Sequence, residues 1–365
     1  MLNIFSSKKQ SFCILLLPLG ILLTQFSRNF PNLIENFYST DFYKIIANIL
    51  CFITSSLPFS LAELIILSFI TLIIWYILKT IITLYKSYNK RLKILKKFIL
   101  NIFTALGVIY FSFQLLWGFN YQRLTLGKIF HLNVHNSSST ELSSLCVRLI
   151  NSLNTLRVTI NQNKDGVMKL PYDKKHILKT AHLGYDRVPL RYSKLKGNYG
   201  IPKAILLSSL MCYTGITGFY FPFTGEANIN MAEPDSFLPF TITHEMAHQR
   251  GFAKEDEANF IAYIACVNHP DINFQYSGSL SALSYSLNAL WKDDPLAYKK
   301  LILTCSIGVL NDLNYNQSFW QRYSGPIEKI SDKVNDTYLK SQNQRSGTRS
   351  YGEMVDLLLA SHRNK

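Results

Sequence analysis

Apolar residues gather in three long stretches in the N-terminal third of the chain, at residues 11–26, 61–78 and 98–119. A helix needs about 20 predominantly apolar residues to cross the hydrocarbon core of a bilayer. The second stretch, which can be extended to Tyr85, and the third stretch reach that length. The first is shorter, but no small-x-small cleavage site follows it, so we expect an uncleaved anchor rather than a signal peptide. The pattern therefore predicts three transmembrane helices in residues 1–119.

The placement of basic residues predicts how these helices are oriented. Seven lysines and arginines lie between the second and third stretches, from Lys79 to Lys97, whereas the loop between the first two holds only Arg28 and Lys44. The positive-inside rule places the N-terminus and the basic loop in the cytoplasm. Three crossings then put everything after Tyr121 outside. We expect a multi-pass plasma-membrane protein with an extracytoplasmic domain, and an amphipathic helix at 42–54 lying on the outer bilayer surface.

The remaining chain is mainly helical by pattern, with one short β region. Apolar positions between Leu142 and Leu156 recur with helical period, after an N-cap signal at residues 136–140. Residues 219–223 and 226–231 are typical of two short strands joined at Thr224-Gly225. Helices are expected at 238–250, 255–268, 278–291, 295–312, 317–341 (interrupted near Pro326) and 351–361, the last with a capping box at Ser350. The predicted fold class is α+β, mainly α: a membrane domain at 1–119, a helical tether at 120–180, and a C-terminal domain with the small β region at 181–365.

Charge and cysteine content exclude two classes of protein. The net charge is +15, but residues 1–119 hold eleven of the 38 basic residues and only three of the 23 acidic ones. The C-terminal part is thus only mildly basic and shows no Lys/Arg stripe with interleaved aromatics, so we expect no nucleic-acid partner. Six cysteines without a C-x-x-C pair argue against a disulfide scaffold and against thiolate zinc ligation. One disulfide among the four cysteines after residue 120 stays open.

One segment carries a pattern with specific chemistry, His244-Glu245-Met-Ala-His248. Residues four apart on a helix share a face, so both imidazoles can reach one ion. Glu245 lies one step around the helix, where it can contact a metal-bound water without being a ligand. This is the arrangement of a zinc hydrolase in which the glutamate is the general base. A catalytic zinc site generally has three protein ligands and an open fourth position.

Gly251 predicts the stop of the helix that carries this motif, and the third ligand is expected from the next predicted helix, which begins with Glu255, Asp256 and Glu257. Glu255 and Asn259 share a face, whereas Glu257 points roughly 200° away from Glu255. We therefore favour Glu255 as the ligand and Asn259 as a hydrogen-bond partner of a liganding histidine. Glu257 and Asp256 remain alternatives. Three acidic residues in a first helical turn are also favoured by the helix dipole alone.

The combination of His244, Glu245, His248, Glu255 and Asn259 resembles the gluzincin peptidases. The resemblance implies a zincin-like domain, a bound Zn²⁺ and peptide-bond hydrolysis. The wider segment 218–266 looks like an uncharacterised family of bacterial membrane proteins with this motif, a domain of unknown function, and the likeness extends over residues 60–360. One departure is that only six residues separate the second histidine from the glutamate, fewer than in most gluzincins.

The sequence thus predicts a membrane-anchored zinc metallopeptidase that acts on a peptide or protein. Polar positions of the second strand, Glu226, Asn228 and Asn230, are candidates for substrate binding. Candidate oxyanion donors are Tyr220, Tyr351 and His269. Two other functions remain open: a zinc-bearing membrane sensor or signalling receptor, and a non-catalytic membrane binding protein in which the motif only packs.

Overall fold

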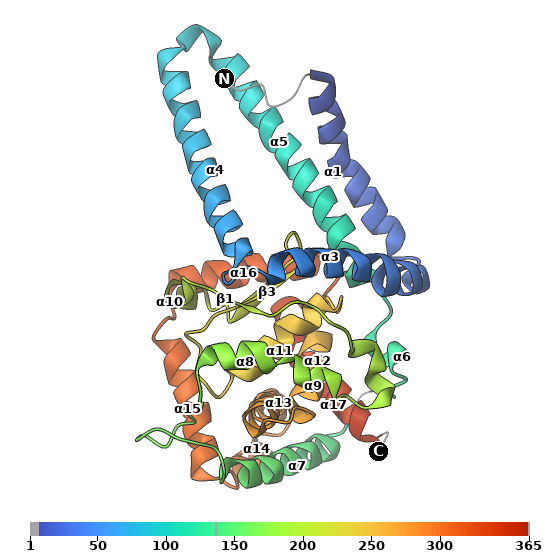
Figure 1. Ribbon diagram of the computed structural model, residues 1–365, viewed down its shortest axis with the longest axis vertical. Helices are drawn as coiled ribbons and strands as arrows, with labels where there is room; N and C mark the ends of the chain where they lie inside the picture. Colours follow the sequence, from blue (N-terminus) through green and yellow to red (C-terminus); the bar gives the residue numbers. More distant parts are fainter. Residues whose placement is uncertain (1–6, 136, 364–365) are drawn as a thin grey trace.

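The computed structural model describes residues 7–135 and 137–363 and has two parts, a group of long apolar helices and a compact helical domain (Figure 1). The long helices are α1 (Ser7–Ser27), α4 (Leu61–Lys86) and α5 (Arg91–Leu116). Helix α4 and the segment Tyr88–Leu116 are each long and apolar enough to cross a membrane. Helix α1 qualifies only together with the following segment Pro31–Ser55, from which it is bent by 100°. The described chain therefore has two or three candidate spans.

Helices α1 and α5 lie side by side (Figure 1). A Cβ atom on Gly107 of α5 would lie 2.5 Å from the backbone oxygen of Cys13, so the glycine permits the close approach of the two backbones. Small residues at such crossings are typical of membrane helix pairs.

A layer of shorter helices crosses the base of the long ones. It contains α2 (Pro31–Leu33), the π-helical segment η1 (Ile34–Phe42), α3 (Tyr43–Ser55) and α16 (Pro326–Ser341). Helix α3 buries one face and exposes large apolar side chains on the other, among them Ile45, Ile49 and Phe52, which is 84% exposed. The amphipathic helix predicted at 42–54 is thus present. Helix α16 likewise exposes Ile327, Ile330 and Val334.

The sheet has three strands in the order β1-β3-β2, with β3 in the centre. Strand β1 (Lys203–Ala204) is parallel to β3 (Glu226–Ile229), and β2 (Gly218–Phe221) is antiparallel to it, with Phe219 opposite Asn228. The two predicted strands are confirmed with shorter limits. Strand β1 was not predicted, because two residues are too few to show an alternating pattern.

The domain core forms around α11 (Leu238–Gln249), α12 (Glu255–Val267) and α13 (Ile272–Asp293), against which α7 (Ser139–Arg157) packs. Leu145 of α7 belongs to the same apolar cluster as Met246 of α11. The segment predicted as a tether, 120–180, is therefore part of the domain core. Around this core lie α6 (Leu126–Ile129), α8 (Lys174–Thr180), α9 (His182–Asp186), α10 (Ser208–Met211), α14 (Pro295–Ile302), α15 (Ile307–Gln321) and α17 (Met354–Arg363).

Several predicted helix limits differ from those observed. The helix predicted at 295–312 is two helices, because the chain turns between Ile302 and Ile307, and α16 begins anew at Pro326. The capping box predicted at Ser350 does not form: this hydroxyl donates to the carbonyl of Gly347, and α17 begins only at Met354. All six cysteines are free, so the disulfide left open by the sequence is not formed.

Buried carboxylates join the sheet to the long helix α4. Glu226 of β3 accepts hydrogen bonds from the backbone N–H groups of Leu61 and Ala62, at 3.1 and 2.7 Å, and from the Thr224 hydroxyl. The first N–H groups of a helix have no partner within the helix, and a negative charge is favourable there. Glu226 therefore caps α4 and fixes it to the central strand.

Replacement of Glu226 by Gln should destabilise the protein, because the cap loses its charge and one acceptor oxygen. We expect the free energy of unfolding to fall by about 1–3 kcal/mol, the usual cost of leaving a buried hydrogen-bonding group unsatisfied. Thermal unfolding of the purified protein in detergent measures this change. Asp41→Asn, at an exposed carboxylate, is the control. Equal stability of the two variants would contradict the capping role.

Candidate metal centre

Helix α11 presents two histidines to one point inside the domain. Every residue of this helix is buried, and His244 and His248 lie one turn apart on it. Their Nε2 atoms are 3.1 Å apart. The helix ends where Gly251 adopts φ +81°, a left-handed conformation that favours glycine. This confirms the helix stop predicted at Gly251.

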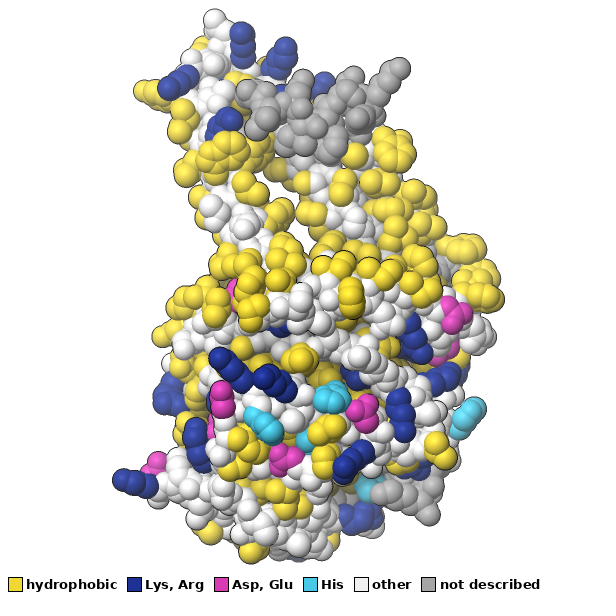
Figure 2. All heavy atoms as spheres, in the orientation of Figure 1, with side chains coloured by type: hydrophobic (Ala, Val, Ile, Leu, Met, Phe, Trp, Pro, Cys, Tyr) yellow, Lys and Arg dark blue, Asp and Glu magenta, His cyan; other side chains and the backbone are white. Residues whose placement is uncertain are grey.

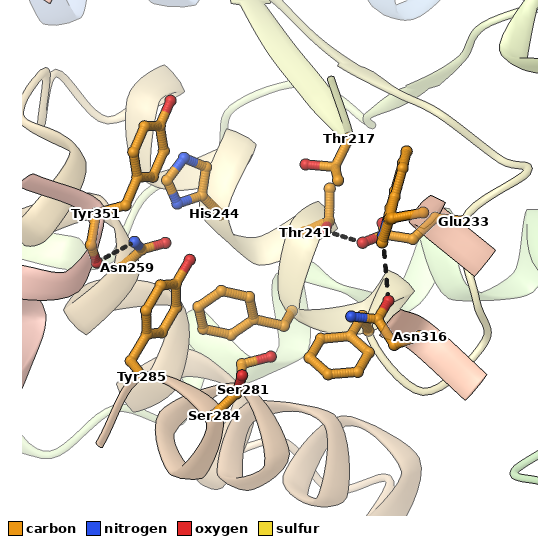
Figure 3. A pocket seen from close by; sticks show the side chains of 13 residues that line it. Thr217, Glu233, Thr241, His244, Asn259, Ser281, Ser284, Tyr285, Asn316 and Tyr351 are labelled. Carbon is orange, nitrogen blue, oxygen red and sulfur yellow. Dashed lines mark hydrogen bonds between the residues drawn. The ribbon is translucent and has the colours of Figure 1, made fainter. Parts of the chain in front are cut away.

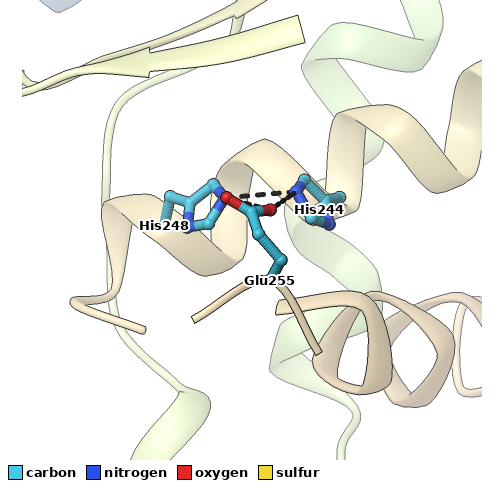
Figure 4. Close-up of side chains that lie close together, drawn as sticks. All are labelled: His244, His248 and Glu255. Carbon is cyan, nitrogen blue, oxygen red and sulfur yellow. Dashed lines mark hydrogen bonds and ion pairs between the residues drawn. The ribbon is translucent and has the colours of Figure 1, made fainter. Parts of the chain in front are cut away.

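The turn after Gly251 reverses the chain and brings the start of α12 to the histidines. The Oε2 atom of Glu255, the first residue of α12, lies 3.2 Å from Nε2 of His244 and 3.5 Å from Nε2 of His248 (Figure 4). The ligand atoms of all three residues lie within 4.8 Å of one another. The short spacing between the second histidine and the glutamate is therefore compatible with a common site, because the left-handed turn needs few residues.

Of the three acidic residues that begin α12, only Glu255 joins the histidines in the cluster found among the described residues. Glu257 points elsewhere: its carboxylate accepts the backbone N–H of Leu126 at 2.9 Å and pairs with Lys254. This arrangement favours Glu255 over Glu257 as the third candidate ligand, as helical geometry predicts.

The hydrogen bonding of His248 leaves its inner nitrogen free to bind a cation. Its Nδ1 atom lies 2.7 Å from the carbonyl oxygen of Phe252, which can only accept, so Nδ1 carries the hydrogen. The lone pair of Nε2 then points toward His244 and Glu255. A fixed tautomer of this kind, held by a backbone carbonyl, is typical of metal-binding histidines.

The charges in the cluster are strongly coupled when no metal is bound. Burial by itself lowers the pKa of His248, but the neighbouring Glu255 carboxylate outweighs it and raises this pKa to about 9. Burial likewise raises the pKa of Glu255, and the two histidines outweigh it and lower this pKa to about 2. The cluster thus attracts positive charge, which a proton or a metal ion can supply.

The donor set fits zinc. Two imidazole nitrogens and one carboxylate oxygen converge, which is the three-ligand set of catalytic zinc sites with an open fourth position. All three side chains are less than one tenth exposed. Because buried lone pairs that face one another repel unless a cation lies between them, the geometry favours an ion at this point.

Glu245 lies beside the cluster and has an oxygen without a partner. The residue is 4% exposed, and no described group hydrogen-bonds to its Oε2 atom. On its other side the carboxylate contacts the backbone of β2, where a Cβ atom on Gly218 would lie 2.8 Å from Oε1. Burial raises the pKa of Glu245, while His244 and His248 act against this.

The structure assigns other contacts to the remaining predicted site residues. Asn259 donates from Nδ2 to the backbone carbonyl of Tyr351 at 2.9 Å, and no hydrogen bond to a histidine is found for it among the described residues. It therefore positions the 3₁₀ segment η6 (Gly347–Glu353), in which the Tyr351 ring lies 6.4 Å from that of His244.

The three residues predicted to bind substrate are buried in the fold instead. Glu226 caps α4, as described above. Asn228 accepts a hydrogen bond from the Ser60 hydroxyl at 2.6 Å, and Asn230 donates to the carbonyl of Ile216. All three are at most 2% exposed. β3 is paired on both edges as the central strand and also packs against α11 and α4, so these side chains are enclosed rather than open to a cleft.

Of the predicted oxyanion donors, Tyr351 lies at the cluster. Tyr220 belongs to an aromatic group with Tyr43 and Trp117. The Trp117 ring is 6.0 Å from that of His248. His269 bonds to the carbonyl of Thr180 and stacks on Phe274, and it belongs to the packing around α9 and α13. The position of Tyr43 and Trp117 close to the histidines was not predicted, because both lie more than a hundred residues before the motif and carry no local signal.

A cavity of about 230 Å³ opens beside His244 (Figure 3). Its wall is formed by residues of α11, α13, α15 and η6 and by Glu233, which follows β3. Thr241 and His244 contribute from α11, Ser281 from α13 and Asn316 from α15. The cavity, and the place of Glu233 in its wall, were not predicted, because the elements that form the cavity are distant from one another in sequence.

The fold defines a mainly helical domain attached to candidate membrane helices, with a buried His-His-Glu cluster. The family described as "Protein of unknown function (DUF3810)" matches residues 38–359, and the chain belongs to that family. This match covers both the candidate membrane helices α4 and α5 and the domain. Comparisons with curated proteins and with solved structures gave no match.

Proposed function

We propose that this protein is a membrane-anchored zinc metallopeptidase with a zincin-like domain. The observation that carries the proposal is the convergence of His244, His248 and Glu255, with the partnerless carboxylate of Glu245 beside them. The resemblance of the motif to gluzincins agrees with this reading. A protein in which the motif only packs gives no reason to bury a carboxylate oxygen without a partner, because such burial is costly.

The proposed reaction is the hydrolysis of an amide bond. Zinc held by His244, His248 and Glu255 would lower the pKa of a bound water and polarise the substrate carbonyl. Glu245 would accept a proton from the attacking water and pass it to the leaving nitrogen, with a C–O bond formed and the C–N bond broken. The Phe252 carbonyl keeps His248 in the tautomer that the site needs. Of the predicted hydroxyl donors, Tyr351 has its ring 6.4 Å from that of His244 and is the candidate to stabilise the oxyanion.

We further propose that the domain lies outside the cytoplasm of the cell. The connection between α4 and α5 lies at the end of these helices farthest from the domain, and basic side chains gather there (Figure 2). The positive-inside rule assigns that end to the cytoplasm. The exposed apolar faces of α3 and α16 then rest on the outer surface of the lipid bilayer.

The metal site is tested by the metal content of the full-length protein. We expect about one zinc per chain, as for a site with three protein ligands, and its loss in His248→Ala. Glu245→Gln should keep the zinc but lower the hydrolysis of a mixed-sequence peptide library by about 10²–10⁴-fold, because it removes the general base. Elemental analysis and mass spectrometry measure the two effects. A folded wild-type protein without stoichiometric metal would overturn the proposal.

The packing of Gly218 against Glu245 gives a second test. In Gly218→Ala the added Cβ would lie 2.7 Å from Cγ of Glu245 and 3.0 Å from the Asn228 carbonyl, so the carboxylate must move. We expect peptide hydrolysis to fall by about 10²-fold, the usual effect of misplacing a catalytic group, with unchanged zinc content. Gly352→Ala is the matched control, because an added Cβ there meets no atom within 4 Å. Equal activity of both variants would contradict the assigned position of Glu245.

The membrane orientation is tested by labelling single introduced cysteines with a membrane-impermeant maleimide. Tyr88 lies in the connection between α4 and α5 and is 74% exposed, and Val158 follows α7 and is 84% exposed. In intact spheroplasts we expect Val158→Cys to be labelled and Tyr88→Cys to react only after permeabilisation. Five of the native cysteines are buried, which keeps the background low. The reverse labelling pattern would place the domain in the cytoplasm.

A further inference from the structure

The cavity beside His244 contains a buried carboxylate that no cation neutralises. Glu233 is 4% exposed, and its Oε1 atom accepts a hydrogen bond from the Thr241 hydroxyl at 3.0 Å. Its Oε2 atom has no hydrogen-bond partner, and no ion pair to this carboxylate is found among the described residues. A buried acceptor in this state is costly for the fold unless a ligand supplies the missing donor.

The nearest lysine is occupied elsewhere. Lys174 pairs with Asp235 at 3.1 Å and donates to the backbone carbonyls of Met231 and Glu233, the latter at 3.3 Å. Its charge is thus shared with another carboxylate and with the backbone. Burial raises the pKa of Glu233 to about 8, with Thr241 and Lys174 acting against this. Among the described residues, no side chain therefore forms an ion pair with Glu233 at this end of the cavity.

The rest of the cavity wall suits an alkyl chain that ends in a cation. Aromatic side chains of Phe237, Phe240 and Trp320 line it together with Glu233 (Figure 3). Aromatic faces attract cations and pack well against methylene groups. His244 lies in the same wall, so a group that fills the cavity is attached close to the metal centre.

We propose that this cavity is a substrate subsite that binds an alkylammonium group through Glu233, and that the protein acts on peptides that carry such an amine next to the cleaved bond. The inference rests on the proposed function for the reaction but not for the binding. The amine can belong to a side chain or to a free amino terminus, since both offer the same N–H donors and charge.

Binding to the full-length, metal-free protein in detergent tests the inference, with four small probes measured by calorimetry. N-acetyl-lysine amide is compared with its uncharged isostere N-acetyl-norleucine amide, and leucine amide with N-acetyl-leucine amide. We expect at least one amine to bind about tenfold or more tightly than its uncharged partner, because a buried charge pair is formed. A preference in the first pair assigns the site to a side chain, and one in the second pair to an amino terminus.

Variants identify the side chain that produces the preference for amines over uncharged probes. In Glu233→Gln the advantage of the amine should disappear, while the amide can still accept from Thr241. In Glu328→Gln, outside the cavity and still able to cap α16, the advantage should persist. Trp320→Leu should weaken amine binding even if Glu233→Gln does not fold. Equal binding of charged and uncharged probes to the wild type, or an unchanged advantage in Glu233→Gln, would overturn the inference.

The metal content of the protein as purified, measured before the metal is removed for the binding experiment, separates this inference from the proposed function. Stoichiometric zinc without an amine preference would overturn the subsite alone. An amine preference in a protein that binds no zinc would support the subsite and overturn the peptidase.

Discussion

The structure depends on one electrostatic constraint, the close approach of two imidazole nitrogens and a carboxylate oxygen at 3.1–3.5 Å inside the domain. Atoms with lone pairs can face one another in a buried site only if they share a proton or a metal ion. The surrounding fold holds them there. The fully buried helix α11, the left-handed turn at Gly251 and the carbonyl of Phe252 each fix one part of the arrangement.

The membrane-facing layer is physically part of this support. Arg123, which follows α5, pairs with Glu35 of η1 at 2.8 Å and donates to the carbonyl of Gly251 at 2.7 Å. The Tyr43 hydroxyl of α3 lies 3.0 Å from the carbonyl of Gln249, at the end of α11. The segment between α1 and α4 is therefore hydrogen-bonded to the turn that follows the two histidines. The family match at residues 38–359 includes Tyr43, Arg123 and Gly251, which make these contacts.

The sequence predicted what depends on local pattern. The apolar stretches, the helical motif, the Gly251 stop and the two strands follow from spacing along the chain, and so does the choice of Glu255 over Glu257 as candidate ligand. What depends on tertiary contacts was missed or misjudged. Glu226 has the alternating pattern of a half-exposed strand, but the start of α4 covers it. Glu233 showed no pattern, because its cavity is assembled from elements distant in sequence.

Two sets of buried carboxylates differ in how their oxygens are paired. Glu35, Glu63 and Glu226 lie at the junction with the long helices, and both oxygens of each have partners: Arg123 for Glu35, and backbone N–H groups for the other two. Glu233 and Glu245, on either side of His244 in the chain, each keep one oxygen without a partner. The proposed function accounts for this unmet hydrogen-bonding capacity: a water would bind at Glu245 and a donor group of the substrate at Glu233, both beside His244.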